Sequence, residues 1–286
     1  MRDGGLGKLQ RRMRRFGDTL NPDDAYLSYH DVRLTRGDMQ SLKNDWLTDN
    51  VREMLLLICS TVTWEANIRI MIIGHLFLGG IDNGRYLEHE FLVQYRSSNI
   101  VLLRPSMSFM ILQTPNPHSL REALPDFSRT THVFLPINDC RNVTEAEGGT
   151  HWSLLLISIV DGIAFHYDSL PPGNFWEART VTMKFAALLG RPINYVHLED
   201  SPVQENGSDC GVFVCLSMRH LLLKRLLTAN ANEKVSMSLG GRKVDARSGR
   251  KEMAKIIEGF RKEGERRRSA SLSPLGKKST SPPRIE

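Results

Sequence analysis

The sequence HWSLLLISI at residues 151–159, followed by DG at 161–162 and IAFHY at 163–167, decides the fold of this chain. The first run is largely apolar, which is typical of a buried strand. Asp-Gly favours a tight turn, so we expect the two runs to pair as an antiparallel hairpin. A buried β-sheet is therefore predicted at the centre of the chain.

Other strands and helices are expected on both sides of this hairpin. Strand-like patterns cover 26–36, 131–137 and 193–198, and helical patterns cover 175–189 and 210–227. Met253, Ile256, Ile257 and Phe260 follow helical spacing, and shorter helices are expected near Asp38 and Thr48. Together these patterns predict one α+β domain over residues 25–260.

The two ends of the chain differ in composition from its middle. Residues 1–15 hold six Lys/Arg against one acid and residues 261–286 hold eight against three, so the net charge of +6 leaves −4 for residues 16–260. We therefore expect a disordered basic arm over 1–24 and a disordered basic Ser/Pro tail over 261–286. A basic nucleic-acid face on the domain is not indicated, and the basic clusters fit nuclear-import signals as well as solubilising charge.

Cellular location is constrained by the cysteines and the apolar runs. The chain has four cysteines, no Cys-x-x-Cys pair and no apolar signal segment at its start, which favours a reducing compartment, cytoplasmic and/or nuclear. Its most apolar stretch, residues 54–81, contains Glu65, Asn67 and Arg69, so no membrane span is predicted. We expect a monomer.

Cys210 is the candidate nucleophile. It stands where the turn at residues 206–209 leads into a helix, and the free amides at a helix start stabilise a negatively charged sulfur. A small buried hydrophobe is the alternative for any lone cysteine. Cys215, well inside the same helix, fits that alternative better.

A cysteine nucleophile needs a base and an orienting group. His151 begins one strand of the hairpin and Asp168 follows the other, so the imidazole and the carboxylate are expected side by side. His166 lies on the same hairpin, where a structural role is the more frequent one. Gln204 precedes Cys210 by six residues and could donate to an oxyanion, or could be an ordinary loop residue.

Read together, four motifs resemble the ubiquitin-like-protein-specific cysteine proteases, which comprise SUMO proteases and deneddylases. The motifs are WLTD at 46–49, GGTHWSL at 148–154, FHYDS at 165–169 and QENGSDCG at 204–211. Thr48 stands where the family usually has asparagine. The resemblance implies a papain-like fold with the order His, Asp, Gln, Cys along the chain.

This resemblance implies a role for each matching residue. Cys210 would be the nucleophile, His151 the general base and acid, Asp168 its orienting group and Gln204 the oxyanion donor. Trp152 and Trp46 would form a lid over the Gly-Gly end of a modifier, since a narrow slot admits only residues without Cβ. Asp49 would lie near the modifier's tail, or would simply be a carboxylate at a helix start.

The substrate branch is indicated by the run GGTHWSL and by LSYHD at 27–31, which look like the deneddylase branch. We therefore expect removal or maturation of the neddylation modifier, with SUMO as the alternative. Residues 52–85 have no counterpart in the family, and are either a genuine insertion or translated non-coding sequence. No metal or cofactor is implied, because the His and Cys positions lack zinc spacing.

Two other functional classes remain open. The same His, Asp, Cys order could serve an acyltransferase, in which an amine or hydroxyl instead of water resolves the acyl-cysteine. The Trp46 and Trp152 slot argues against that class, because an acetyl group needs no such lid. A non-enzymatic modifier-binding protein is the other class, and an intact His151, Asp168 and Cys210 argues against it.

Overall fold

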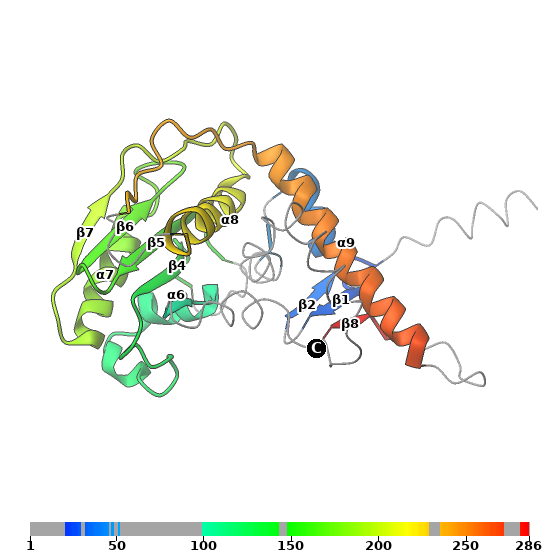
Figure 1. The fold of residues 1–286 in the computed structure, drawn as a ribbon, viewed down its shortest axis with the longest axis horizontal. Helices are drawn as coiled ribbons and strands as arrows, with labels where there is room; N and C mark the ends of the chain where they lie inside the picture. Colours follow the sequence, from blue (N-terminus) through cyan, green and yellow to red (C-terminus); the bar gives the residue numbers. More distant parts are fainter. Residues whose placement is uncertain are drawn as a thin grey trace, which may run out of the picture.

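The computed structural model describes residues 21–29, 32–45, 47, 48, 51, 99–142, 148–228, 235–271 and 281–285. These residues form a three-stranded sheet, a five-stranded sheet and the helices around them (Figure 1). The strands are β1 (Ala25–Tyr29), β2 (Val32–Thr35), β3 (Ile100–Leu102), β4 (His132–Asn138), β5 (Trp152–Ser158), β6 (Ile163–Tyr167), β7 (Asn194–His197) and β8 (Arg284–Ile285). The helices are α2 (Arg36–Asn44), α6 (Pro105–Gln113), η2 (Pro117–Leu120), α7 (Phe175–Leu189), α8 (Cys210–Leu221), the π-helical turn η3 (Leu222–Leu226) and α9 (Ala246–Ser271).

The five-stranded sheet has the order β3-β4-β5-β6-β7. The β4–β5 and β5–β6 pairs are antiparallel, whereas β3 and β7 pair in parallel at the two edges. Leu154 and Leu156 pack into the core that contains α8, while Leu155 and Ile157 pack into the core that contains α7. Because both faces of β5 are covered, its sequence is a continuous apolar run instead of an alternating one.

The three-stranded sheet has the order β2-β1-β8 and packs against α9 and α2 (Figure 1). Leu27, Leu34 and Ile257 are among the fully buried side chains of this second core. Thr35 caps α2 through a capping box, since its hydroxyl accepts from the amide of Asp38 and its own amide donates to the Asp38 carboxylate.

The structure confirms the expected hairpin, the helix over 175–189 and the helix that begins at Cys210. No sequence pattern indicated β3, η2 or α6, and α6 is an apolar helix with proline at its start. Of the expected helix near Thr48 only Thr48 and Val51 are described. The segment 52–85 lies outside the described residues, as do residues 1–20 of the expected arm.

The expected disordered tail over 261–286 differs from the structure, because α9 continues to Ser271. Arg261 pairs with Glu258 and Glu265, and Arg267 pairs with Glu263, at spacings of three or four residues. Such pairs stabilise a helix that has few apolar residues. The net charge of the segment does not show these pairs, and the predicted disorder of residues 261–271 was therefore wrong. Ile285 of β8 is buried against β1 in the second core, so the last described residues are docked as well.

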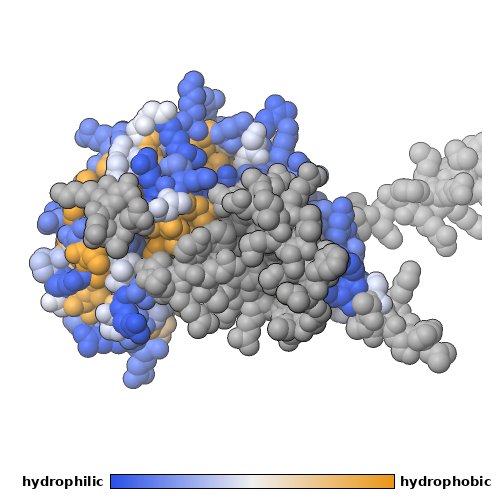
Figure 2. Space-filling view, viewed as in Figure 1, coloured by the Kyte–Doolittle hydropathy of each residue, from blue (hydrophilic) through white to orange (hydrophobic). Residues whose placement is uncertain are grey.

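On the face seen in Figure 2, apolar patches lie between hydrophilic ones over the body that carries the five-stranded sheet. Within the described ranges, no helix has the length and apolar character needed to cross a membrane.

Candidate active site

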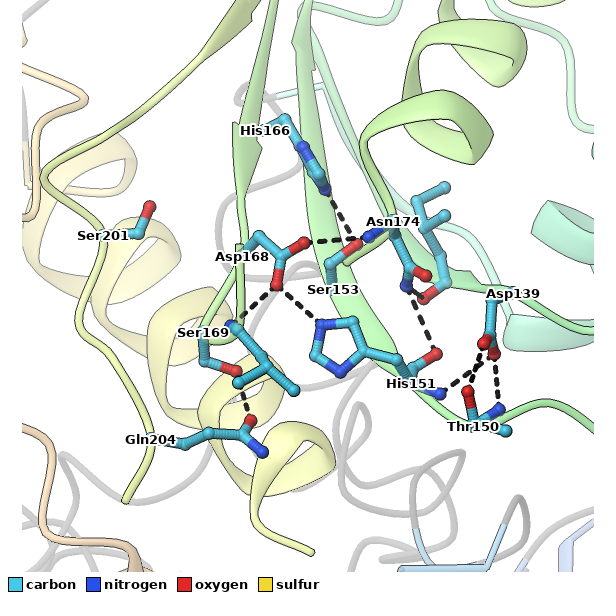
Figure 3. Close-up of polar contacts among 12 residues, drawn as sticks. Asp139, Thr150, His151, Ser153, His166, Asp168, Ser169, Asn174, Ser201 and Gln204 are labelled. Atoms are coloured by element: carbon cyan, nitrogen blue, oxygen red, sulfur yellow. Dashed lines mark hydrogen bonds and ion pairs between the residues drawn. The ribbon is translucent and has the colours of Figure 1, made fainter. Parts of the chain in front are cut away.

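His151 and Asp168 meet at one end of the β5–β6 hairpin. His151 immediately precedes β5 and Asp168 immediately follows β6, so antiparallel pairing brings both side chains to the same end of the sheet. The imidazole Nε2 lies 2.6 Å from Asp168 Oδ1, and both side chains are buried (Figure 3). The pairing expected from the sequence is therefore present.

The surroundings of this pair favour the charged form of each partner. Burial alone would lower the pKa of His151, but hydrogen bonds with Asp168 and Cys210 raise it from its ordinary value to about 9. Burial opposes ionisation of Asp168 too, yet hydrogen bonds from His151 and from the amides of Leu170 and Asn174 lower its pKa to about 2. At neutral pH the pair is an imidazolium and a carboxylate.

Cys210 is the first residue of α8 and is 1% exposed. Asp168 occupies Nε2 of His151, which leaves Nδ1 of the ring for the sulfur. Because Cys210 stands at the start of α8, the amides of the first helical turn, which have no acceptor within the helix, favour a negative charge there. Cys215, one turn further, is buried in the core between α8 and α9.

Gln204 lies beside this group in the loop that precedes α8. Its Oε1 accepts a 2.7 Å hydrogen bond from the hydroxyl of Ser169, and its Nε2 donates to the carbonyl of Asn206 at 2.6 Å. The backbone amide of Gln204 donates to the backbone carbonyl of Ser169. The side chain is thus held from both ends, with one N–H left for another acceptor, and its oxyanion role stays a prediction.

Asn174 is a supporting residue that no sequence pattern indicated. Its side-chain amide donates to the carbonyls of Ile137 and His151, at 3.0 and 3.2 Å, and its backbone amide donates to Asp168 Oδ2 at 3.0 Å (Figure 3). It is fully buried. One residue therefore fixes both members of the pair from the side of α7.

Two glycines allow close approach around the site. A Cβ on Gly173 would lie 2.6 Å from His151 Cδ2 and 2.7 Å from Asp168 Oδ2. Gly149 has a φ of +90°, and a Cβ there would lie 2.7 Å from Asp139 Oδ1. That carboxylate accepts from the amides of Thr150 and His151, which anchors the start of β5.

Trp152 is 5% exposed and packs in the same core as Cys210. Together with Asp168 and Phe213 it lines a small pocket beside the pair. Trp46 and Asp49, the other two predicted substrate contacts, lie outside the described residues.

His166 is not part of this constellation, although it sits on the same hairpin. Its Nε2 faces the hydroxyl of Ser153 at 2.8 Å and its Nδ1 faces the hydroxyl of Tyr195 at 2.8 Å. Burial lowers the pKa of His166 to about 3, so the ring is neutral at physiological pH. Across the described ranges, no cluster of three His, Cys, Asp or Glu residues is arranged to hold a metal ion.

Comparison with known proteins gives a consistent result. Residues 115–258 match the Ulp1 protease family, C-terminal catalytic domain. The chain is 38% identical over 162 residues to NEDD8-specific protease 2 of Schizosaccharomyces pombe, a match that covers 56% of this chain and 38% of that protein. It is 30% identical over 201 residues to NEDD8-specific protease 1 of Arabidopsis thaliana, with coverage of 69% and 75%.

The chain thus spans well under half the length of the fission yeast relative and three quarters of the plant one. Among solved structures, the SUMO protease Ulp1 with its catalytic cysteine oxidised to a sulfinic acid is 17% identical. Its TM-score is 0.53, and the alignment covers 90% of this chain and 94% of that one. This likeness confirms the expected α+β cysteine-protease fold.

Proposed function

This chain belongs to the Ulp1 protease family, and from that premise we propose that it is a thiol peptidase that cleaves after the C-terminal Gly-Gly of a ubiquitin-like modifier. The observation that carries the proposal is the imidazole of His151, which is shared between the carboxylate of Asp168 and the thiol of Cys210. A buried imidazolium next to a thiolate is the arrangement that activates a cysteine nucleophile.

The proposed reaction begins with the Cys210 thiolate, which attacks the carbonyl of the terminal glycine. The backbone amide of Cys210 and the free N–H of Gln204 stabilise the oxyanion that forms, a contribution of about 10²–10³-fold. His151 then protonates the leaving lysine amine, or the peptide nitrogen of a precursor, and the acyl-enzyme remains. In the second half His151 deprotonates a water, which releases the modifier.

The raised pKa of His151 suits this sequence of steps. With a pKa of about 9 the ring carries its proton at neutral pH and is ready to act as the acid for the leaving amine. The hydrogen bond at Nε2 keeps the ring oriented while Nδ1 exchanges a proton with the sulfur and the leaving group. Asp168 stays ionised throughout, because its own pKa is far below neutrality.

NEDD8 is the modifier we propose first, and SUMO the second. The relatives that are 38% and 30% identical to this chain are NEDD8-specific proteases. The solved Ulp1 structures are 15–18% identical to this chain, which supports the fold alone. We also propose that Trp152 and Trp46 enclose the Gly-Gly tail, with Asp49 near it.

The test is reaction with a panel of modifiers, NEDD8, SUMO and ubiquitin, each with a thiol-reactive warhead in place of the terminal carboxylate. We expect NEDD8 alone to form a covalent adduct, which disappears in Cys210→Ala and persists in Cys215→Ala, a matched control one turn away. Labelling by SUMO would keep the mechanism and overturn the branch. A native protein that no modifier labels would refute the proposed function.

A further inference from the structure

Arg250 is a buried arginine of α9, 5% exposed, that lies next to the loop leading to the nucleophile Cys210. Its Nε and Nη2 lie 2.8 and 2.7 Å from Asp209 Oδ1, and Nη2 also donates to the carbonyl of Ser208 at 2.9 Å. Its Nη1 donates to the carbonyl of Ser41, in α2, at 2.9 Å. One guanidinium therefore joins α9, α2 and the residues immediately before Cys210.

The contacts of Arg250 continue to the proposed oxyanion donor. Asp209 Oδ2 accepts from the side-chain amide of Asn206 at 2.7 Å, and Asn206 Oδ1 accepts from the amides of Ser208 and Asp209. The carbonyl of Asn206 in turn accepts from Gln204 Nε2. An unbroken series of hydrogen bonds thus runs from the guanidinium to the amide of Gln204.

Arg250 also pairs with the carboxylate that directly precedes the nucleophile in the chain. Asp209 is adjacent to Cys210, and an unpaired carboxylate there would oppose a thiolate. The buried guanidinium of Arg250 offsets the charge of the partly buried Asp209 carboxylate, in surroundings where like charges repel more strongly than in water. Within the part of the chain that the structure describes, the charged groups near Cys210 include His151 and Asp168 on the hairpin, Asp209 before α8 and Arg250 from α9.

We propose that Arg250 is a positioning residue for the reaction, which fixes the Asn206–Asp209 loop so that Cys210 and Gln204 face the same carbonyl, and neutralises Asp209 beside the thiolate. The expected effect of Arg250 on kcat rests on the proposed function. Its effect on the thiol itself does not depend on which modifier is cleaved.

The experiment compares Arg250→Met, Arg250→Lys and the double variant Arg250→Met/Asp209→Asn with the native protein. The matched control is Arg219→Met, which removes the half-exposed ion pair between α8 and Glu252 of α9. Two quantities are measured: kcat and KM on a fluorogenic modifier substrate, and the pH dependence of Cys210 alkylation by iodoacetamide, followed by peptide mass spectrometry. Circular dichroism establishes that each variant is folded.

We expect Arg250→Met to lower kcat about 100-fold with little change in KM, as for other losses of alignment. Its alkylation profile should move to higher pH, and Asp209→Asn should move it back. Arg250→Lys keeps the charge but not the fork of donors, so kcat should fall while the alkylation profile stays native. Arg219→Met should leave kcat and the profile within twofold of native.

A folded Arg250→Met with native kcat and a native alkylation profile would overturn the proposal, as would equal losses in Arg219→Met. If Arg250→Met does not fold, Arg250→Lys decides, and a native kcat there would also overturn the proposal. If no modifier is cleaved by the native protein, the proposed function fails. The alkylation profiles of the folded variants then still decide the role of Arg250.

Discussion

Replacing Asp168 by asparagine removes the carboxylate charge next to His151 and keeps the size of the side chain. Asp168 accepts on both oxygens, from His151 and the Leu170 amide on Oδ1 and from the Asn174 amide on Oδ2. Asparagine has one acceptor oxygen, so in either orientation its NH₂ group faces an N–H donor. The substitution therefore disturbs both the charge and the geometry of the pair.

The size of the effect follows from the protonation of His151. With its pKa at about 9, the ring is ~97% protonated at pH 7.5, whereas a ring with the ordinary pKa of 6.5 is ~9% protonated. Burial without the carboxylate pushes the pKa lower still. The loss of imidazolium thus accounts for about tenfold in activity, and misalignment of the ring adds about 10–100-fold more.

The assay is kcat/KM on a modifier with a fluorogenic C-terminal leaving group, measured from pH 5.5 to 10. In the native protein the alkaline limb should follow deprotonation of His151, near pH 9. In Asp168→Asn that limb should move to or below pH 6.5, with the maximum lowered about 10²–10³-fold. Asp161→Asn is the matched control, because Asp161 lies in the β5–β6 turn and bonds Ser158.

A folded Asp168→Asn whose alkaline limb stays near pH 9 would refute this reasoning. The carboxylate would then orient the ring without setting its charge, and the limb would report another group. An equal shift in Asp161→Asn would refute it as well, since it would make the effect a general response to lost negative charge.

Three further outcomes are expected. Gly173→Ala should lower kcat about 100-fold, because the added methyl group would displace the His151 ring. Gly259→Ala in α9 should keep full activity, because no atom of the described residues beyond the adjacent helix backbone lies within 4 Å of the added Cβ. Equal activity of the two variants would contradict the close contact at Gly173. The free energy of unfolding in urea should fall as pH rises from 6.5 through about 9. His151 has a higher pKa in the folded protein than in the unfolded chain, so its protonation stabilises the fold fully below pH 6.5, and this contribution is lost as pH rises through about 9. The variant His151→Gln should not show this fall. Ile285→Ala should lower the free energy of unfolding by about 2 kcal/mol, because it leaves a cavity between β8 and α9. Arg284→Ala, at the exposed neighbouring position, should change it by less than about 0.5 kcal/mol. Equal stability of the two variants in thermal or urea melts would argue against docking of β8.

Local patterns account for the elements that could be read from the chain. The apolar run before Asp161-Gly162 and the helical spacing over 175–189 each depend on near neighbours, so β5, β6 and α7 were predicted close to their observed bounds. The continuation of α9 to Ser271 was missed, because it depends on which charges pair along a helix and not on how many there are.

The sequence by itself determined the hairpin, the cysteine at a helix start and the order His151, Asp168, Gln204, Cys210, since turn chemistry, apolar runs and motif order are local properties. Only the tertiary structure decided that Asn174, just before α7, supports the pair and that Arg250 of α9 reaches the loop before the nucleophile. These two are buried polar side chains whose partners are distant in the chain. Their roles follow from the need to satisfy buried donors and charges, and that need exists only once the helices have packed.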